Sequence, residues 1–265
     1  MGSEMCIRDR LLFVKRIREL WDTAQRRDCV TFSDFLNLNE QNILHQTLQK
    51  FSWIKGETFG GYEGAERQIA AFIPDALYIT GEWENDVGLI SYPISCIRIV
   101  PRNAKFADQL THRDILGALM NLGIERSKTG DIAVCGKESY LFCSPHLAQL
   151  ICRELIRIRH TSVACTLCDL TEFSYHPRTE MIRGSAASIR LDAVMAIAFQ
   201  SSRSSLLSLV SDGCVFINGR VITTNAYALK EQDIVSVRGY GRFRYIGEIG
   251  ATKKGRHMIE LEKYI

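Results

Sequence analysis

The stretch RLDAVMAIAFQSSRSSLLSLVSDGCVFINGR, which runs from Arg190 to Arg220, decides the fold of the C-terminal third of the chain. Its apolar residues recur at the spacing of a helix face and predict two short helices, 190–199 and 202–211. The pair Asp212-Gly213 predicts a turn, and the apolar run Val215–Ile217 predicts a strand after it. The stretch therefore predicts two helices followed by the first strand of a sheet.

Two further apolar runs continue this sheet. Ile234–Val237 and Phe243–Ile249 have the length and the β-branched or aromatic content of strands. Asn218-Gly219 and Gly239-Tyr240-Gly241 predict turns between the strands. We expect the two helices to pack their Leu, Val and Ile faces on this small bent sheet, which would give a compact αα-β unit.

The N-terminal part of the chain predicts a helical module. Leu11 to Trp21 has apolar residues at helical spacing. Ser33 is placed to cap a second helix, which would carry Phe35 to Leu48. The adjacent glycines of Gly60–Arg67 predict a loop after it.

Beyond this loop the order of predicted elements is typical of a sheet with helices on one face. Thr111 and Asp114 have the spacing of a capping box at the start of a helix that Gly123 would end. Ser144-Pro145 would start a second helix, which is expected to end near Arg159. The predicted strands are Gln68–Ile73, Val87–Val100, Asp131–Cys135, Ser139–Cys143 and Val163–Phe173.

The predicted fold class is α+β, and 265 residues suffice for two or three small domains. Residues 1–10 are set apart as a non-native leader because their composition matches nothing that follows. The other predicted parts are a helical module at 11–59, a central α/β sandwich at 60–175, a linker at 176–183, the αα-β domain at 184–250 and a tail at 251–265.

Positive charge gathers in the last third, although the formal net charge of the chain is only +3. From Arg178 to Ile265 there are 13 Lys and Arg residues against 8 Asp and Glu, whereas the rest of the chain has 20 against 22. This asymmetry indicates a polyanionic partner for the C-terminal unit. No run reaches the roughly 18 apolar residues of a membrane span, and nine cysteines without a regular framework indicate reduced thiols.

The second predicted helix begins with Ser202-Arg203-Ser204, and a helix N-terminus with hydroxyl groups suits phosphate binding. Arginines from loops and strand ends would complete a cationic rim around it. Solvated surface arginines are the alternative for Arg203 and Arg238, and a solvated basic turn is the alternative for Lys253-Lys254. The candidate phosphate-binding residues are Arg190, Ser202, Arg203, Ser204, Asn218, Arg220, Arg238, Arg242, Arg244, Lys253 and Lys254.

This ordered series of motifs resembles the S-four RNA-binding domain, named after a small-subunit ribosomal protein and also called the αL motif. The resemblance runs from Arg190 to Arg244 and implies that the candidate residues bind structured RNA, without naming a reaction. Many members have basic residues where this chain has Cys214 and Phe216. The matching elements are Arg190-Leu191-Asp192, Ser202-Arg203, Leu206, Val210, Gly213, Val215–Arg220 and Asp233–Gly239.

Four other segments resemble the YlmH family of bacterial ribosome-associated proteins: Gly61–Arg67, His112–Arg126, Gly130-Asp131-Ile132 and Arg238–Phe243. This resemblance implies that the central domain is RRM-like. It also implies a cytoplasmic, non-enzymatic protein that binds rRNA or tRNA on the large ribosomal subunit and acts on stalled subunits that hold peptidyl-tRNA. No cofactor, metal, membrane or small-molecule substrate is expected, and no Gly-rich nucleotide loop occurs.

Other functions remain open at this point. An RNA-modifying enzyme could have its catalytic centre in the central domain, near His112 and Glu66. A cell-division adaptor would instead expose an apolar patch on the N-terminal helices. A Gly-Arg-Leu-Asp element of pseudouridine synthases contains a catalytic aspartate, but Ile189 precedes the matching residues here, which favours a helix N-terminal role for Asp192.

Two local motifs have alternative interpretations. His112-Arg113-Asp114 could support acid–base chemistry, but the capping box already explains Asp114. Cys165 and Cys168 are the only closely spaced cysteines, and a structural zinc site needs four ligands. In a strand, residues three apart point to opposite faces, so free thiols in the core are the preferred interpretation.

Overall fold

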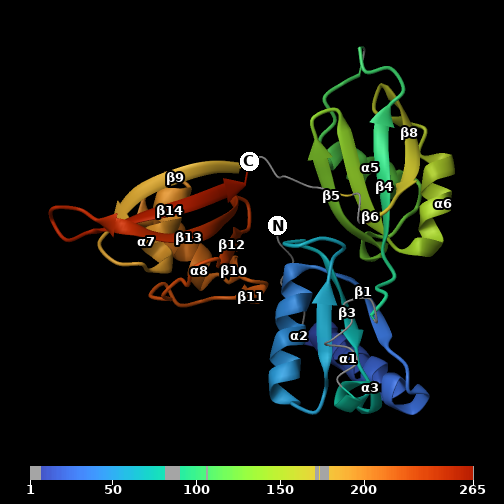
Figure 1. Ribbon diagram of the computed structural model, residues 1–265, viewed down its shortest axis with the longest axis horizontal. Coiled ribbons are helices and arrows are strands. Elements are labelled where there is room, and N and C mark those ends of the chain that lie inside the picture. The colour runs from blue at the N-terminus through green and yellow to red at the C-terminus, as the bar shows by residue number, and fades with distance from the viewer. Residues whose placement is uncertain (1–6, 81–89, 106, 171–172, 174–178, 265) are drawn as a thin grey trace. The chain divides into compact units, whose positions relative to one another are not determined.

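The computed structural model describes residues 7–80, 90–105, 107–170, 173 and 179–264. The chain forms two compact units, which divide between Tyr175 and His176. The first unit contains an N-terminal module and a central domain, and the second contains the predicted αα-β domain (Figure 1).

The N-terminal module combines helices with a small antiparallel sheet. Helix α1 (Ile7–Arg27) packs against helix α2 (Leu38–Lys50) and the sheet, around a core that includes Ile17, Leu44 and Phe72. Since α1 begins at Ile7, residues 7–10 of the predicted leader continue the same helix. A short helix, α3 (Asp75–Thr80), follows the sheet. The strands, in spatial order, are β1 (Thr31–Leu36), β3 (Gln68–Phe72) and β2 (Gly56–Phe59).

The helix predicted to start at Ser33 is wrong, because residues 31–36 form strand β1. The Ser33 hydroxyl accepts a hydrogen bond from the Ala70 N–H of the neighbouring strand instead of capping a helix. Phe35 and Leu36 alternate between two different buried clusters, as strand residues do. Helix α2 begins later and is capped by Asn37.

The central domain is a five-stranded antiparallel sheet with helices α5 (His112–Asn121) and α6 (Pro145–Glu154) on one face (Figure 1). A short 3-10 helix, Arg126–Lys128, leads directly into the strand at one edge of this sheet. This arrangement confirms the predicted α+β class. The strands, in spatial order, are β5 (Thr129–Cys135), β6 (Glu138–Cys143), β4 (Ser95–Pro101), β8 (Thr161–Cys168) and β7 (Arg157–Ile158).

The strand predicted at 68–73 for the central domain is present as β3, but it belongs to the sheet of the N-terminal module. Most of the other predicted element boundaries of the central domain are confirmed, with three differences. The Thr111 cap and the strands at 131–135 and 139–143 are present. Helix α6 ends at Glu154, before the predicted Arg159, because Leu155 has left the helical conformation (ψ 73) and residues 157–158 pair with β8 as strand β7. Strand β8 ends at Cys168. Strand β4 begins at Ser95, and residues 87–89 of its predicted range lie outside the described residues.

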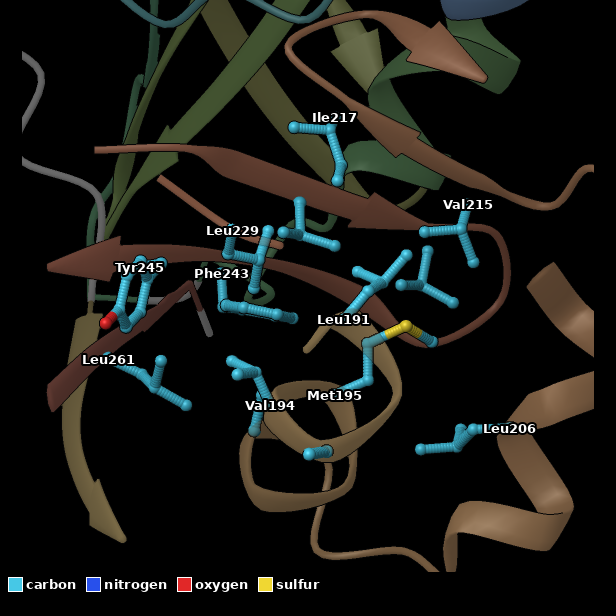
Figure 2. Packing of buried hydrophobic residues seen from close by; sticks show 14 of the residues in the cluster. Leu191, Val194, Met195, Leu206, Val215, Ile217, Leu229, Phe243, Tyr245 and Leu261 are labelled. Atoms are coloured by element: carbon cyan, nitrogen blue, oxygen red, sulfur yellow. The ribbon is translucent and has the colours of Figure 1, made fainter. Parts of the chain in front are cut away.

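The C-terminal unit places helices α7 (Leu191–Ala198) and α8 (Arg203–Ser211) on a six-stranded antiparallel sheet, as predicted for the two helices. Leu191, Met195 and Leu206 point from the helices toward Phe243 and Leu261 of the sheet, and all five are buried (Figure 2). The strands, in spatial order, are β11 (Arg220–Val221), β10 (Val215–Ile217), β12 (Ile234–Val237), β13 (Gly241–Ala251), β14 (His257–Tyr264) and β9 (Thr179–Ala186).

This unit is larger than predicted. Residues 179–183 of the predicted linker belong to strand β9, while 176–178 lie outside the described residues. Most of the predicted tail forms β14, which pairs with β13 on one side and with β9 on the other. Ile259 and Leu261 of β14 are fully buried in the core, so this strand is part of the folded unit.

One carboxylate joins the N-terminal module to the central sheet. Asp131 of β5 accepts hydrogen bonds at Oδ2 from the Tyr62 hydroxyl and the Glu66 N–H, both at 2.7 Å. Its Oδ1 accepts a third from the Arg67 N–H at 3.0 Å. Because hydrogen bonds to a charged group are the stronger ones, Asp131 fixes the loop 60–67 on the edge of the central sheet.

A glycine completes this joint. Gly61 has φ +99, and a Cβ atom on it would lie 2.5 Å from Cδ1 of the buried Phe142 ring. Only a residue without a side chain allows the loop to approach the ring so closely.

We therefore expect Gly61→Ala to lower the free energy of unfolding of the first unit by about 2–4 kcal/mol, from backbone strain and from overpacking. Gly64→Ala is a matched control, because Gly64 also has a positive φ (+79) but has open space around it. Its expected cost is only about 1 kcal/mol. Chemical denaturation measures both, and equal costs would contradict the close packing of Gly61 on Phe142.

Candidate nucleic-acid interface

The N-terminal turn of α8 presents hydroxyl groups and an arginine to solvent. Ser202 is the N-cap, and its Oγ accepts a hydrogen bond from the Ser205 N–H at 3.3 Å. Its hydroxyl also lies 3.0 Å from that of Ser204. Arg203 is exposed, and the first turn contains no acidic residue. The positive end of this helix is therefore uncompensated within its own turn, which favours an anion such as phosphate.

The core of the C-terminal unit determines where this turn lies. Leu206 and Val210 of α8 are buried in the core that α7 and the sheet share, one and two turns after the exposed residues; Figure 2 shows Leu206. Their burial anchors the helix and leaves Ser202, Arg203 and Ser204 exposed at its start. The sequence thus predicted the exposure of these three residues correctly, from the apolar spacing within the helix.

Arg190 lies at the N-cap of α7, and its charge is shared with a neighbour. Its Nε is 3.3 Å from Oδ1 of Asp192, in the first turn of the same helix. The Arg190 side chain is about half exposed, whereas that of Asp192 is mostly buried. Asp192 therefore has the helix N-terminal position expected from the sequence, and it also partly neutralises Arg190.

Asn218 is a structural residue of the turn between β10 and β11. It has φ +49, a conformation that Asn tolerates better than most residues. Its Nδ2 donates to Oδ1 of the buried Asp233 at 2.8 Å, and its Oδ1 accepts from the Ile234 N–H at 2.9 Å. Because both ends of the amide form hydrogen bonds, Asn218 stabilises the conformation of the turn. Arg220, two residues further on, is exposed.

The turn after β12 brings an aromatic side chain to the surface on the helix side of the sheet, whereas Arg238 of the same turn lies on the outer face. Tyr240 is 43% exposed, and its ring contacts that of Phe199, at the C-terminal cap of α7, with 5.6 Å between centroids. The Arg238 guanidinium lies 5.9 Å from the ring centroid of Phe216, which is buried. Tyr240 was not among the candidate residues from the sequence, although its position between two glycines and near two arginines was a usable signal.

Arg242 and Arg244 lie on the sheet face that points away from the helices, so the predicted single cationic rim is not formed as expected. They alternate along β13 with Phe243, which packs in the helix-covered core. On this outer face the Arg242 guanidinium lies 4.4 Å from the Tyr264 ring centroid. Nε of Arg244 is 3.9 Å from a carboxylate oxygen of Glu262. Lys253 and Lys254 are exposed in the hairpin turn between β13 and β14.

The uncovered face of an RRM-like sheet could stack bases, but here the chain itself covers part of it. Phe142 of β6 is fully buried, with the Tyr62 ring 5.1 Å away. The Phe173 ring lies 4.9 Å from that of Phe142 and 5.0 Å from that of Tyr140. These rings pack against one another, so they are not available to stack on a base in this structure.

The motifs considered for catalysis or metal binding have ordinary structural places. Asp114 forms the predicted capping box with Thr111. Cys165 packs in the core beneath the helices and Cys168 in the cluster on the other face, as alternation predicts.

Within the described ranges, no group of three or more His, Cys, Asp and Glu side chains could hold a metal ion. No helix in those ranges is both long and apolar enough to cross a membrane.

Comparison with known protein families agrees with this division of the chain. A family model described as "YlmH, N-terminal" matches residues 11–76, and one described as "Putative RNA-binding domain in YlmH" matches 91–172. A model described as "S4 domain" matches residues 189–235. The C-terminal unit is therefore an RNA-binding domain of the S-four class.

A relative with a curated name identifies the family. The chain is 31% identical to "Ribosome-associated protein quality control protein P2" of Bacillus subtilis (strain 168), over 97% of this chain and 96% of the relative. A solved structure, "Cell division protein ylmH from Streptococcus pneumoniae", is 23% identical with a TM-score of 0.48, and the match covers 65% of this chain and 98% of that one. The chain belongs to the YlmH family.

The geometry of Asn218 generates a prediction about stability. Asn218→Ala should lower the free energy of unfolding of the C-terminal unit by about 2–3 kcal/mol, because it strains the turn and leaves the buried Asp233 carboxylate with a missing donor. Arg220→Ala, at the start of β11 next to this turn, should change it by less than about 0.5 kcal/mol. Denaturant titration followed by near-UV circular dichroism checks both. A loss of RNA affinity by folded Asn218→Ala protein, without a loss of stability, would instead give Asn218 a direct contact with RNA.

Proposed function

We propose that this protein is a non-enzymatic factor of the cytoplasm that binds RNA on the large ribosomal subunit and acts in the quality control of stalled subunits carrying peptidyl-tRNA. The name of the B. subtilis relative supports a role at the ribosome, since that relative matches almost the whole chain. The S-four domain supports binding to structured rRNA or tRNA. In this proposal the protein contributes binding and positioning, and no catalytic step is assigned to it.

The observation that carries the proposal is the exposed N-terminal turn of α8. Ser202 and Ser204 offer hydroxyl groups, Arg203 offers a charge, and no carboxylate of the same turn competes for the anion. Groups of this kind contact the RNA backbone rather than the bases, so affinity should be sensitive to salt and recognition should depend on RNA shape. Tyr240, which contacts Phe199 at the end of α7, is proposed to extend the surface.

We expect Arg203→Glu to weaken binding to purified large ribosomal subunits roughly tenfold or more, because it removes a phosphate contact and adds a repulsive charge. The slope of log affinity against log salt should fall by about one. Arg153→Glu makes the same change in net charge at an exposed position of α6, and it should leave both quantities unchanged. Filter binding across a salt series measures them. Unchanged affinity of Arg203→Glu at physiological salt would reject this surface.

A further inference from the structure

Two arginines of the first unit converge on a single carbonyl group. Nε of Arg67 donates to the Thr129 carbonyl oxygen at 2.9 Å, and Nη1 of Arg126 approaches the same oxygen at 3.5 Å. Nη2 of Arg67 also donates to the carbonyl oxygen of Arg126 at 3.0 Å. The two guanidinium groups are therefore held next to each other by the main chain.

Such a pair of like charges needs a reason, because it is electrostatically unfavourable. Burial lowers the pKa of Arg126 to about 10, and the charge of Arg67 is the second cause. The carboxylates of Asp131, Glu66 and Glu40 compensate the pair in part, but the oxygens of Asp131 already accept from Tyr62 and from two backbone N–H groups. Among the described residues, no carboxylate oxygen lies within 4.0 Å of either guanidinium group, so neither arginine forms an ion pair.

The guanidinium of Arg126 is held by hydrogen bonds at Nη1. Its Nη1 is anchored by Oγ1 of Thr129 at 2.8 Å and by the Gly130 carbonyl oxygen at 3.0 Å, in addition to the shared carbonyl. In the part of the chain that the structure describes, its Nε and Nη2 have no partner, and they are not sealed from solvent. A preorganised edge with two parallel N–H donors is the geometry that binds phosphate oxygens.

The first two residues of α5, His112 and Arg113, are exposed. Burial lowers the pKa of His112, and the charges of Arg126 and Arg113 lower it further. Lys128 is different, because it is paired with Asp34 at 2.6 Å.

We propose that Arg126, with Arg67 held next to it and with His112 and Arg113 at the start of α5, binds a phosphate diester of an RNA backbone. We call these four residues the Arg126 cluster. The inference deepens the proposed function, on which it rests, by giving the central domain a specific contact with RNA. It also explains how the central domain, which matches a model described as a putative RNA-binding domain, could bind RNA although Tyr62 and Phe173 cover the aromatic residues of its sheet. Contacts to backbone phosphates need no stacking surface.

The test uses the full chain and purified large ribosomal subunits, in filter binding across a salt series. Arg126→Gln removes the charge and the fork, and Arg113→Ala removes an exposed charge without touching the joint to the N-terminal module. Arg153→Ala is the control, because it removes an equally exposed arginine from α6. Arg203→Glu reports separately on the S-four surface. Thermal unfolding of each variant shows whether it is folded.

We expect Arg126→Gln to weaken binding about tenfold and Arg113→Ala about threefold, each with a salt slope lower by about one, while Arg153→Ala leaves both unchanged. If Arg203→Glu loses binding but folded Arg126→Gln and Arg113→Ala keep the full affinity and slope, the cluster is structural and this inference is overturned alone. If Arg203→Glu also binds normally, the proposed function fails together with it. Should Arg126→Gln fail to fold, Arg113→Ala decides the question by its slope.

Discussion

The Asp131 carboxylate is the interaction on which the architecture of the first unit depends. Its three hydrogen bonds to Tyr62 and to the N–H groups of Glu66 and Arg67 tie a loop of the N-terminal module to the edge strand of the central sheet. Two consequences follow from this position of the loop. The Tyr62 ring covers Phe142, and the Arg67 side chain enters the interior, where it meets the Thr129 carbonyl group.

The two units offer an anion different kinds of surface. In the C-terminal unit, the end of a helix and its hydroxyl groups provide partial charges together with the full charge of Arg203. In the first unit, the proposed contact is a rigid guanidinium edge held by carbonyl groups. Neither surface contains an array of groups suited to reading bases. Shape and charge, rather than sequence, should therefore govern which RNA the protein binds.

Local patterns in the sequence predicted the features that depend on neighbours along the chain. The Thr111–Asp114 capping box and the two helices of the S-four domain are determined within a few residues, and all are present.

The prediction for Ser33 was wrong because its hydroxyl accepts a hydrogen bond from the Ala70 N–H, on a strand far away in sequence. The outer-face position of Arg242 and Arg244 could have been deduced, since Phe243 between them is plainly a core residue and a strand alternates its faces. Strand β14 also shows this alternation, but its pairing with β9 joins segments far apart in the chain. The proximity of Arg67 and Arg126 is a tertiary property that no local pattern contains.

The most direct measurement is photo-crosslinking of the full chain to large ribosomal subunits whose RNA carries 4-thiouridine, with the crosslinked peptides identified by mass spectrometry. RNA should attach to peptides from the start of α8, from the turn around Tyr240 and from the start of α5 or the segment at Arg126. Crosslinks that instead concentrate on the sheet aromatics Tyr140 and Phe142, or on the outer sheet face at Arg242 and Arg244, would contradict the assignment of both RNA-binding surfaces.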